Sequence, residues 1–157
     1  MMSKKSRWVI AGVSALVIGS LGCGPAPEES PIDDGPLTGT FNGTRWRFVS
    51  GTSERFTTDS NKILSTLSEA EQTACEAKGV ERLVIAIPFK PGVYPLDLAM
   101  TVHFVTPQGN DDLAATEGKL IVHEVSDETI KAGLYAIYNG NPNYEVSGQF
   151  TVNRCPF

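Results

Sequence analysis

The sequence TFNGTRWRF, residues 40–48, predicts a β-hairpin. Its Asn42-Gly43 pair favours a two-residue hairpin turn, because both residues accept a positive φ angle. Side chains alternate between the two faces of a strand, so Trp46 and Phe48 share one face and the arginines beside them share the other. This alternation is typical of a strand that buries one face and exposes the other.

Several more segments after this hairpin have strand character. Residues 82–87, RLVIAI, form a continuous apolar run that is typical of a central strand. Clusters rich in Gly, Pro, Asn and Asp separate the segments and predict turns. Residues 50–61 fit either a loop or an irregular edge strand. Further strands are expected at residues 62–67, 92–96, 101–105, 118–125, 129–138 and 144–152.

One short helix is predicted between these strands, at about residues 69–78. Ser68 and Glu71 have the spacing of a capping box, and Gly79 suits a helix end. Short strands with frequent turns and a single helix predict one mainly β domain over residues 37–157. We expect an antiparallel β-sandwich or a partly closed barrel.

The N-terminus has the parts of a secretory signal. A short basic stretch that ends at Arg7 precedes an uncharged, mostly apolar run over residues 8–21. This run is shorter than the roughly 20 residues that a membrane-spanning helix needs. We therefore expect residues 1–22 to be a signal peptide.

The sequence SLGC, residues 20–23, resembles the lipobox of bacterial lipoproteins. The resemblance implies cleavage before Cys23 and attachment of fatty-acyl chains such as palmitate through its sulfur, which would anchor the protein in the cell envelope. The family prefers leucine where this chain has Ser20, so an ordinary cleaved signal and an uncleaved N-terminal anchor stay open as alternatives. Gly24 is not the aspartate that retains many enteric lipoproteins at the inner membrane, and we expect the outer membrane.

Residues 23–36 are predicted to be the lipidated cysteine and a tether. Proline and acidic residues dominate this segment, which has too little apolar surface to offset the entropy of ordering. Without the three cations of the signal, 10 basic residues remain against 18 acidic ones, a formal charge of −8. A nucleic acid is therefore not an expected partner.

Three strand segments resemble those of a group of small, uncharacterised bacterial lipoproteins. They are GVY at residues 92–94, GKLIV at 118–122 and VSGQF at 146–150, followed by Cys155 near the end of the chain. The group carries no known activity, so the resemblance implies a β-rich fold and no particular chemistry.

Cys75 and Cys155 remain once Cys23 is lipidated. Disulfides persist in exported proteins, and two cysteines leave a single pairing. We predict a Cys75–Cys155 disulfide; two separate buried thiols are the alternative.

No catalytic, metal or cofactor motif stands out in the exported part. The nucleophile elbow Gly-x-Ser-x-Gly is missing from it, and His103 and His123 are the two histidines of the chain, so an enzyme is not expected. These histidines and a cysteine are a conceivable zinc site, but their spacing matches no zinc motif. Residues 109–112, GNDD, offer oxygen atoms to calcium without the spacing of a calcium loop.

A stacking platform for a glycan is a further hypothesis, and core packing explains the same aromatic residues better. These residues are Trp46, Tyr94, Tyr135, Tyr138 and Tyr144.

Two functions follow from the sequence as a whole. The first is a lipid-anchored, non-catalytic binding or structural module that contacts the membrane through Cys23 and an envelope protein or glycan through its domain. The second is a small-ligand carrier with a pocket in the mouth of a barrel.

Overall fold

The chain is mainly β in the computed structural model, which describes residues 32–156 except 57, 72–74, 76–81, 99, 107–111 and 141–143. The signal peptide and Cys23 lie outside the described residues. The strands are β1 (Thr38–Phe41), β2 (Thr44–Arg47), β3 (Ser50–Arg55), β4 (Lys62–Ser68), β5 (Arg82–Pro88), β6 (Gly92–Pro95), β7 (Val102–Val105), β8 (Asp112–Ala114), β9 (Glu117–Val125), β10 (Thr129–Tyr138) and β11 (Tyr144–Arg154).

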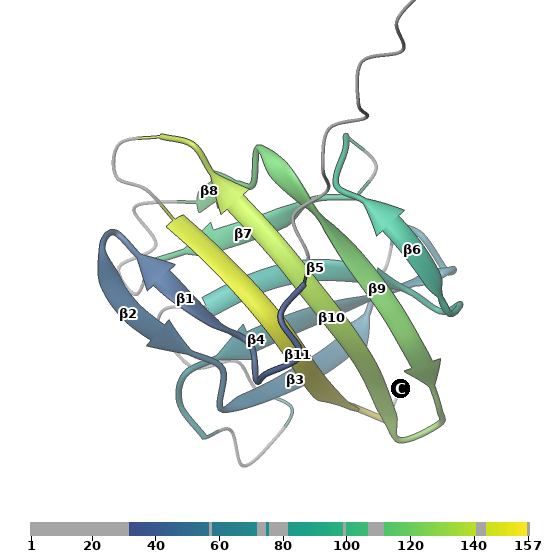
Figure 1. The fold of residues 1–157 in the computed structure, drawn as a ribbon. Coiled ribbons are helices and arrows are strands. Elements are labelled where there is room, and N and C mark those ends of the chain that lie inside the picture. The colour runs from purple at the N-terminus through teal and green to yellow at the C-terminus, as the bar shows by residue number, and fades with distance from the viewer. Residues whose placement is uncertain are drawn as a thin grey trace, which may run out of the picture.

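All of these strands belong to one sheet that curls into a half-barrel. Its main order is β6-β9-β10-β11-β3-β4-β5-β7-β8. In Figure 1 the strands β9, β10 and β11 form one layer, and β4, β5 and β7 cross behind them as a second layer. The predicted mainly β fold is confirmed, and the half-barrel curl of the sheet agrees with the expected partly closed barrel.

Strand β11 joins the two layers. One of its edges pairs with β10 along ten residues. Its other edge is shared, because β1 pairs antiparallel with residues 145–147 and β3 pairs parallel with Asn153 and Arg154. A long strand that serves two neighbours on one edge allows the sheet to turn back on itself.

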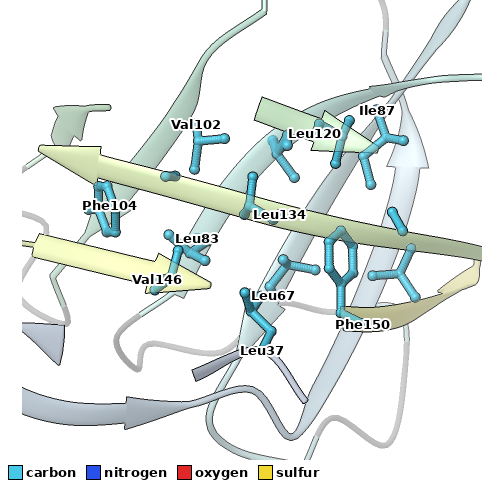
Figure 2. Close-up of a cluster of buried hydrophobic side chains, with 14 of the residues drawn as sticks. Leu37, Leu67, Leu83, Ile87, Val102, Phe104, Leu120, Leu134, Val146 and Phe150 are labelled. Atoms are coloured by element: carbon cyan, nitrogen blue, oxygen red, sulfur yellow. The ribbon is translucent and has the colours of Figure 1, made fainter. Parts of the chain in front are cut away.

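The core fills the space between the two layers. Side chains from both layers point toward one another in Figure 2, among them Leu67 and Leu83 from the second layer and Leu134 and Val146 from the first. Strands β4 and β5 alternate between half-buried and buried positions, as strands with one face on a core do. The buried cluster comprises Leu37, Phe41, Trp46, Ile63, Leu67, Leu83, Ile85, Ile87, Met100, Val102, Phe104, Leu120, Val122, Ile130, Ala132, Leu134, Ala136, Tyr144, Val146, Phe150 and Val152.

The predicted hairpin is confirmed at residues 38–47. Asn42 and Gly43 have φ angles of 48° and 75°, which is the pair of positive angles that a type I′ turn requires. The hairpin places Phe41 against Trp46, with ring centroids 5.1 Å apart. Phe41 also meets Phe104 of β7 at 5.3 Å, so the aromatic rings link the hairpin to the second layer.

The predicted helix at residues 69–78 is not seen. Ser68, expected to cap it, is the last residue of β4 and pairs with Ser50 and Arg82 on the two neighbouring strands. Its hydroxyl accepts a hydrogen bond from the Ala70 N–H at 3.1 Å, which closes a turn and not a helix. Pairing on both edges outweighs the local capping pattern. Residues 72–74 and 76–78 of the expected helix lie outside the described residues.

Cys75 and Cys155 lie at disulfide distance, as predicted. Their sulfur atoms are 2.10 Å apart and their Cα atoms 5.7 Å apart. Cys155 follows β11, and its N–H donates to the carbonyl of Ser53 on β3 at 3.1 Å. The bridge therefore ties the connection between β4 and β5 to the junction of β11 and β3.

Candidate functional site

A groove lies on the outer face of the second layer, away from the core. It has a volume of about 390 Å³, within the range of small-molecule sites. The groove follows β5, with β4 on one side and β7 and β8 on the other. Its lining residues are Phe56, Leu64, Arg82, Val84, Ile85, Ala86, Thr101, His103, Val105 and Asp112.

Strand register explains the apolar side of the groove. Leu64 of β4 lies opposite Ala86 of β5, and both are half-buried, because the alternate residues of each strand face the core. Val84 occupies the same outer face two residues before Ala86. Phe56, just after β3, completes the lining. The groove thus presents a strip of apolar side chains on a face that antiparallel sheets often leave polar.

Three polar side chains form a connected chain on the opposite side. His103 Nδ1 lies 2.6 Å from Asp112 Oδ1, and His103 Nε2 lies 3.1 Å from Thr101 Oγ1. Thr101 and His103 are two residues apart and therefore share a face. Asp112 reaches them because β8 pairs with β7 and places Asp112 opposite Val105.

Hydroxyl, imidazole and carboxylate follow one another here in the order of an acyl-transfer triad. In such triads the carboxylate is buried, so that it holds the imidazole and stabilises its charged form. The Asp112 side chain is 65% exposed and that of His103 is 36% exposed. Water screens such a pair strongly, and we interpret the chain as a polar rim that fixes the orientation of the imidazole.

Arg82 supplies a positive charge at one end of the groove. It is the first residue of β5, and it lies opposite Val105 of β7. Among the described residues its guanidinium has no hydrogen-bond or ion-pair partner. Within the described part of the chain, a permanently charged fork of donors thus lies beside an apolar strip without a partner.

A second hollow lies on the outer face of the first layer and is more polar. The segment before β1 lies over β11 there, with the Gln149 N–H donating to the Gly35 carbonyl at 2.8 Å and the Leu37 N–H donating to the Gln149 carbonyl at 2.8 Å (Figure 1). The Gln149 side chain donates to the Asp33 carbonyl at 3.0 Å. Residues 33–36, which composition assigns to the tether, therefore occupy part of this face.

The structure separates the residues of the conceivable zinc site. His103 lines the groove of the second layer, whereas His123 lies on β9 of the first layer, with Nε2 3.0 Å from Gln149 Oε1. Both remaining cysteines are bonded to each other. Within the described part of the chain, no group of three or more metal-ligating side chains comes together.

The calcium hypothesis concerns residues 109–112. Residues 109–111 lie outside the described residues, and the Asp112 carboxylate contacts His103.

The aromatic residues pack as predicted where they are buried. Trp46 and Tyr144 are fully buried in the core cluster, and Tyr138 packs against Tyr144 with ring centroids 6.2 Å apart. The Tyr94 hydroxyl donates to the Lys90 carbonyl at 2.7 Å. These contacts leave Trp46 and Tyr144 unable to stack on a glycan.

Sequence reasoning missed the groove because it interpreted residues 82–87 only as a central strand. A continuous apolar run does not show which of its residues face the core. Residues 107–112 were expected to form a turn, so strand β8 and its contact with His103 were also missed. One feature of the sequence could have indicated the groove: Arg82, Val84 and Ala86 are alternate residues and therefore share one face of the strand.

No helix in the described residues has the length and apolar character that a membrane span requires. Comparison with known proteins gives no relative from which to transfer a role: no family model, no curated protein and no solved structure matches the chain.

Proposed function

We propose that this protein is a non-catalytic binding module of the bacterial cell envelope, anchored through Cys23, and that the groove along β5 is its binding surface. One observation carries the proposal. The core cluster lies between the two layers, whereas the outer face holds an apolar groove with an arginine that has no partner among the described residues. Exposed apolar strips of this kind often mark interaction sites.

The carrier alternative, with a pocket in a barrel mouth, finds less support. A carrier needs a cavity of about 300 Å³ or more lined by apolar groups. The residues that would line such a cavity, among them Leu83, Leu134 and Val146, are fully buried in one core cluster and point toward one another between the layers (Figure 2).

The anchor is supported by the sequence alone, because Cys23 lies outside the described residues. Cys23→Ser should abolish acylation, and the protein should then leave the detergent phase on phase partitioning. Arg45→Gln, at an exposed position of β2, is the control and should partition like the unaltered protein. A Cys23→Ser protein that still partitions with detergent contradicts the anchor.

Photo-crosslinking in intact cells tests the binding surface. A benzophenone amino acid replaces Leu64 in the groove in one variant and Val93, which is 63% exposed on β6, in another. We expect ultraviolet light to give a discrete adduct from position 64 and none of the same mass from position 93. Equal adducts from both positions, or none from position 64, would overturn the groove as the binding surface.

A further inference from the structure

We infer that the groove along β5 binds a monocarboxylate with an unbranched aliphatic chain, an amphiphile of the fatty-acid class. This inference rests on the proposed function and names the ligand of the same surface. The groove combines an apolar strip with a guanidinium that has no partner among the described residues, and such a ligand combines one negative charge with an apolar chain.

Arg82 defines the end that takes the carboxylate. Its planar fork of N–H donors matches a carboxylate with two parallel hydrogen bonds. The nearest opposing charge in the lining is Asp112, which stands two strands away because Val105 lies between them in the register. Two strand spacings separate their backbones by about 10 Å. The Asp112 carboxylate moreover lies 2.6 Å from His103 Nδ1, and among the described residues it makes no ion pair with Arg82.

The length of the apolar strip sets the length of the chain. Arg82, Val84 and Ala86 follow one another along one face of β5, and four residues of strand span about 13 Å. An extended alkyl chain advances about 1.25 Å per bond, from a C–C length near 1.5 Å and a tetrahedral angle. A chain of about ten carbons therefore matches the strip, with its end near Leu64 and Phe56.

A peptide fits this groove less well than an alkyl chain. Extended peptides bind sheets by adding a strand to an open edge, where free N–H and C=O groups pair with them. Strand β5 pairs with β4 along residues 82–88 and with β7 along residues 82–85, so most of its backbone groups already belong to ladders. The floor of the groove consists of side chains, and an aliphatic chain needs no backbone partner.

Binding of decanoate to residues 24–157 tests the inference. This stretch contains every described strand, the whole core cluster and both bridged cysteines, so we expect it to fold without the acyl anchor. Titration calorimetry and amide chemical shifts are recorded below the micellar concentration, with decanoate and with decyltrimethylammonium, which has the same chain and the opposite charge. We expect saturable binding of decanoate, with shifts at β5 and β7, and at least tenfold weaker binding of the cation.

Two variants test separately how the head group and the alkyl chain of the ligand contribute to binding. Arg82→Gln should weaken decanoate binding about 10- to 100-fold, the loss expected for a charge-assisted hydrogen bond. Val84→Thr keeps the shape of the strip, adds a hydroxyl and should weaken both amphiphiles. Arg45→Gln removes a cation from β2 and should bind like the unaltered protein. Equal affinity for the two head groups, or an unchanged affinity in Arg82→Gln, would overturn the inference.

Failure of this inference is distinguishable from failure of the proposed function. If decanoate does not bind while position 64 still crosslinks in cells, the groove is the binding surface and its ligand is of another class. If position 64 gives no adduct and decanoate does not bind, both the surface and the ligand are wrong.

Discussion

At the scale of single residues, two serines in direct register show opposite consequences of burying a hydroxyl. Ser53 of β3 lies opposite Ser65 of β4, and both face the core. The Ser53 hydroxyl donates to the Asn153 carbonyl at 2.9 Å, whereas the buried Ser65 hydroxyl has no hydrogen-bond partner in the part of the chain that the structure describes. Burying a polar group without a partner costs about 1–3 kcal/mol, so the Ser65 hydroxyl lowers the stability of the folded state.

Ser65→Ala should therefore raise the free energy of unfolding by up to about 1 kcal/mol, since it removes the unpaired oxygen and opens only a small void. Ser53→Ala, the matched control, should lower it by about 1 kcal/mol, because the Asn153 carbonyl loses its donor. Urea unfolding measures both, with unchanged m values showing that the same surface is exposed. Loss of stability in Ser65→Ala as large as in Ser53→Ala would contradict this account.

Asp59 illustrates how the pKa of a partly exposed carboxylate is lowered by hydrogen bonding within its own turn. The pKa of Asp59 lies below its ordinary value of 3.8, first because the Asn61 N–H donates to its carboxylate at 2.9 Å and further because Lys62 lies 3.5 Å away. A lowered pKa in the folded state contributes stability at neutral pH that is lost as the pH falls through the folded-state pKa.

We expect a carbon-detected titration to place the Asp59 pKa below 3.8, and Lys62→Gln to leave most of the shift in place, because the backbone hydrogen bond is the larger cause. A pKa that returns to its ordinary value in Lys62→Gln would show that the ion pair dominates.

At the scale of elements, the docking of β1 depends on a glycine that lets two backbones approach. A Cβ built on Gly39 would lie 1.9 Å from the Glu145 carbonyl oxygen of β11, and rigid backbone cannot move aside cheaply. The strand carries Phe41 and, through the hairpin, Trp46 into the core. A small clash at Gly39 therefore affects the burial of two large aromatic rings.

Gly39→Ala should lower the free energy of unfolding by more than about 2 kcal/mol, since it forces β1 away from β11 and loosens both rings. Gly35→Ala is the control: a Cβ there has no atom within 4 Å. Thermal unfolding followed by tryptophan fluorescence compares the two variants with the unaltered protein. Equal melting temperatures for Gly39→Ala and Gly35→Ala would contradict a close approach of β1 and β11.

Local patterns predicted most strands of this fold, because alternation and turn residues act within a few positions. The hairpin around Asn42-Gly43 is the clearest case, since the φ angles required by its turn select those two residues. The helix expected after Ser68 was wrong, because Ser68 is paired on both sides by strands distant in sequence. The local sequence around Ser68 therefore could not predict the strand pairing with Ser50 and Arg82 that replaces the helix.

At the scale of the whole molecule, the candidate site could be predicted less well than the strands. The apolar character of Val84 and Ala86 is evident from the sequence, but their outward direction depends on which side of the sheet the core occupies. The contact of His103 with Asp112 needs the register of β7 and β8. The joining of these strands in one curled sheet is what assembles the groove.

The Cys75–Cys155 bridge acts on this whole curled sheet, because it spans 80 residues of sequence and closes on the junction of β11 with β3. The register of that parallel junction contains only two residue pairs, Asn153 with Thr52 and Arg154 with Ser53, so few hydrogen bonds hold the two layers together there.

Loop-closure entropy gives the bridge an upper contribution of about 4–5 kcal/mol. Replacing both cysteines by serine should lower the free energy of unfolding by about 2–5 kcal/mol. The test is urea unfolding of residues 24–157 with and without reductant: the unaltered protein should lose stability on reduction, and the double variant should not respond. If reduction leaves the unaltered midpoint in place, the β11–β3 junction holds the layers together without the bridge.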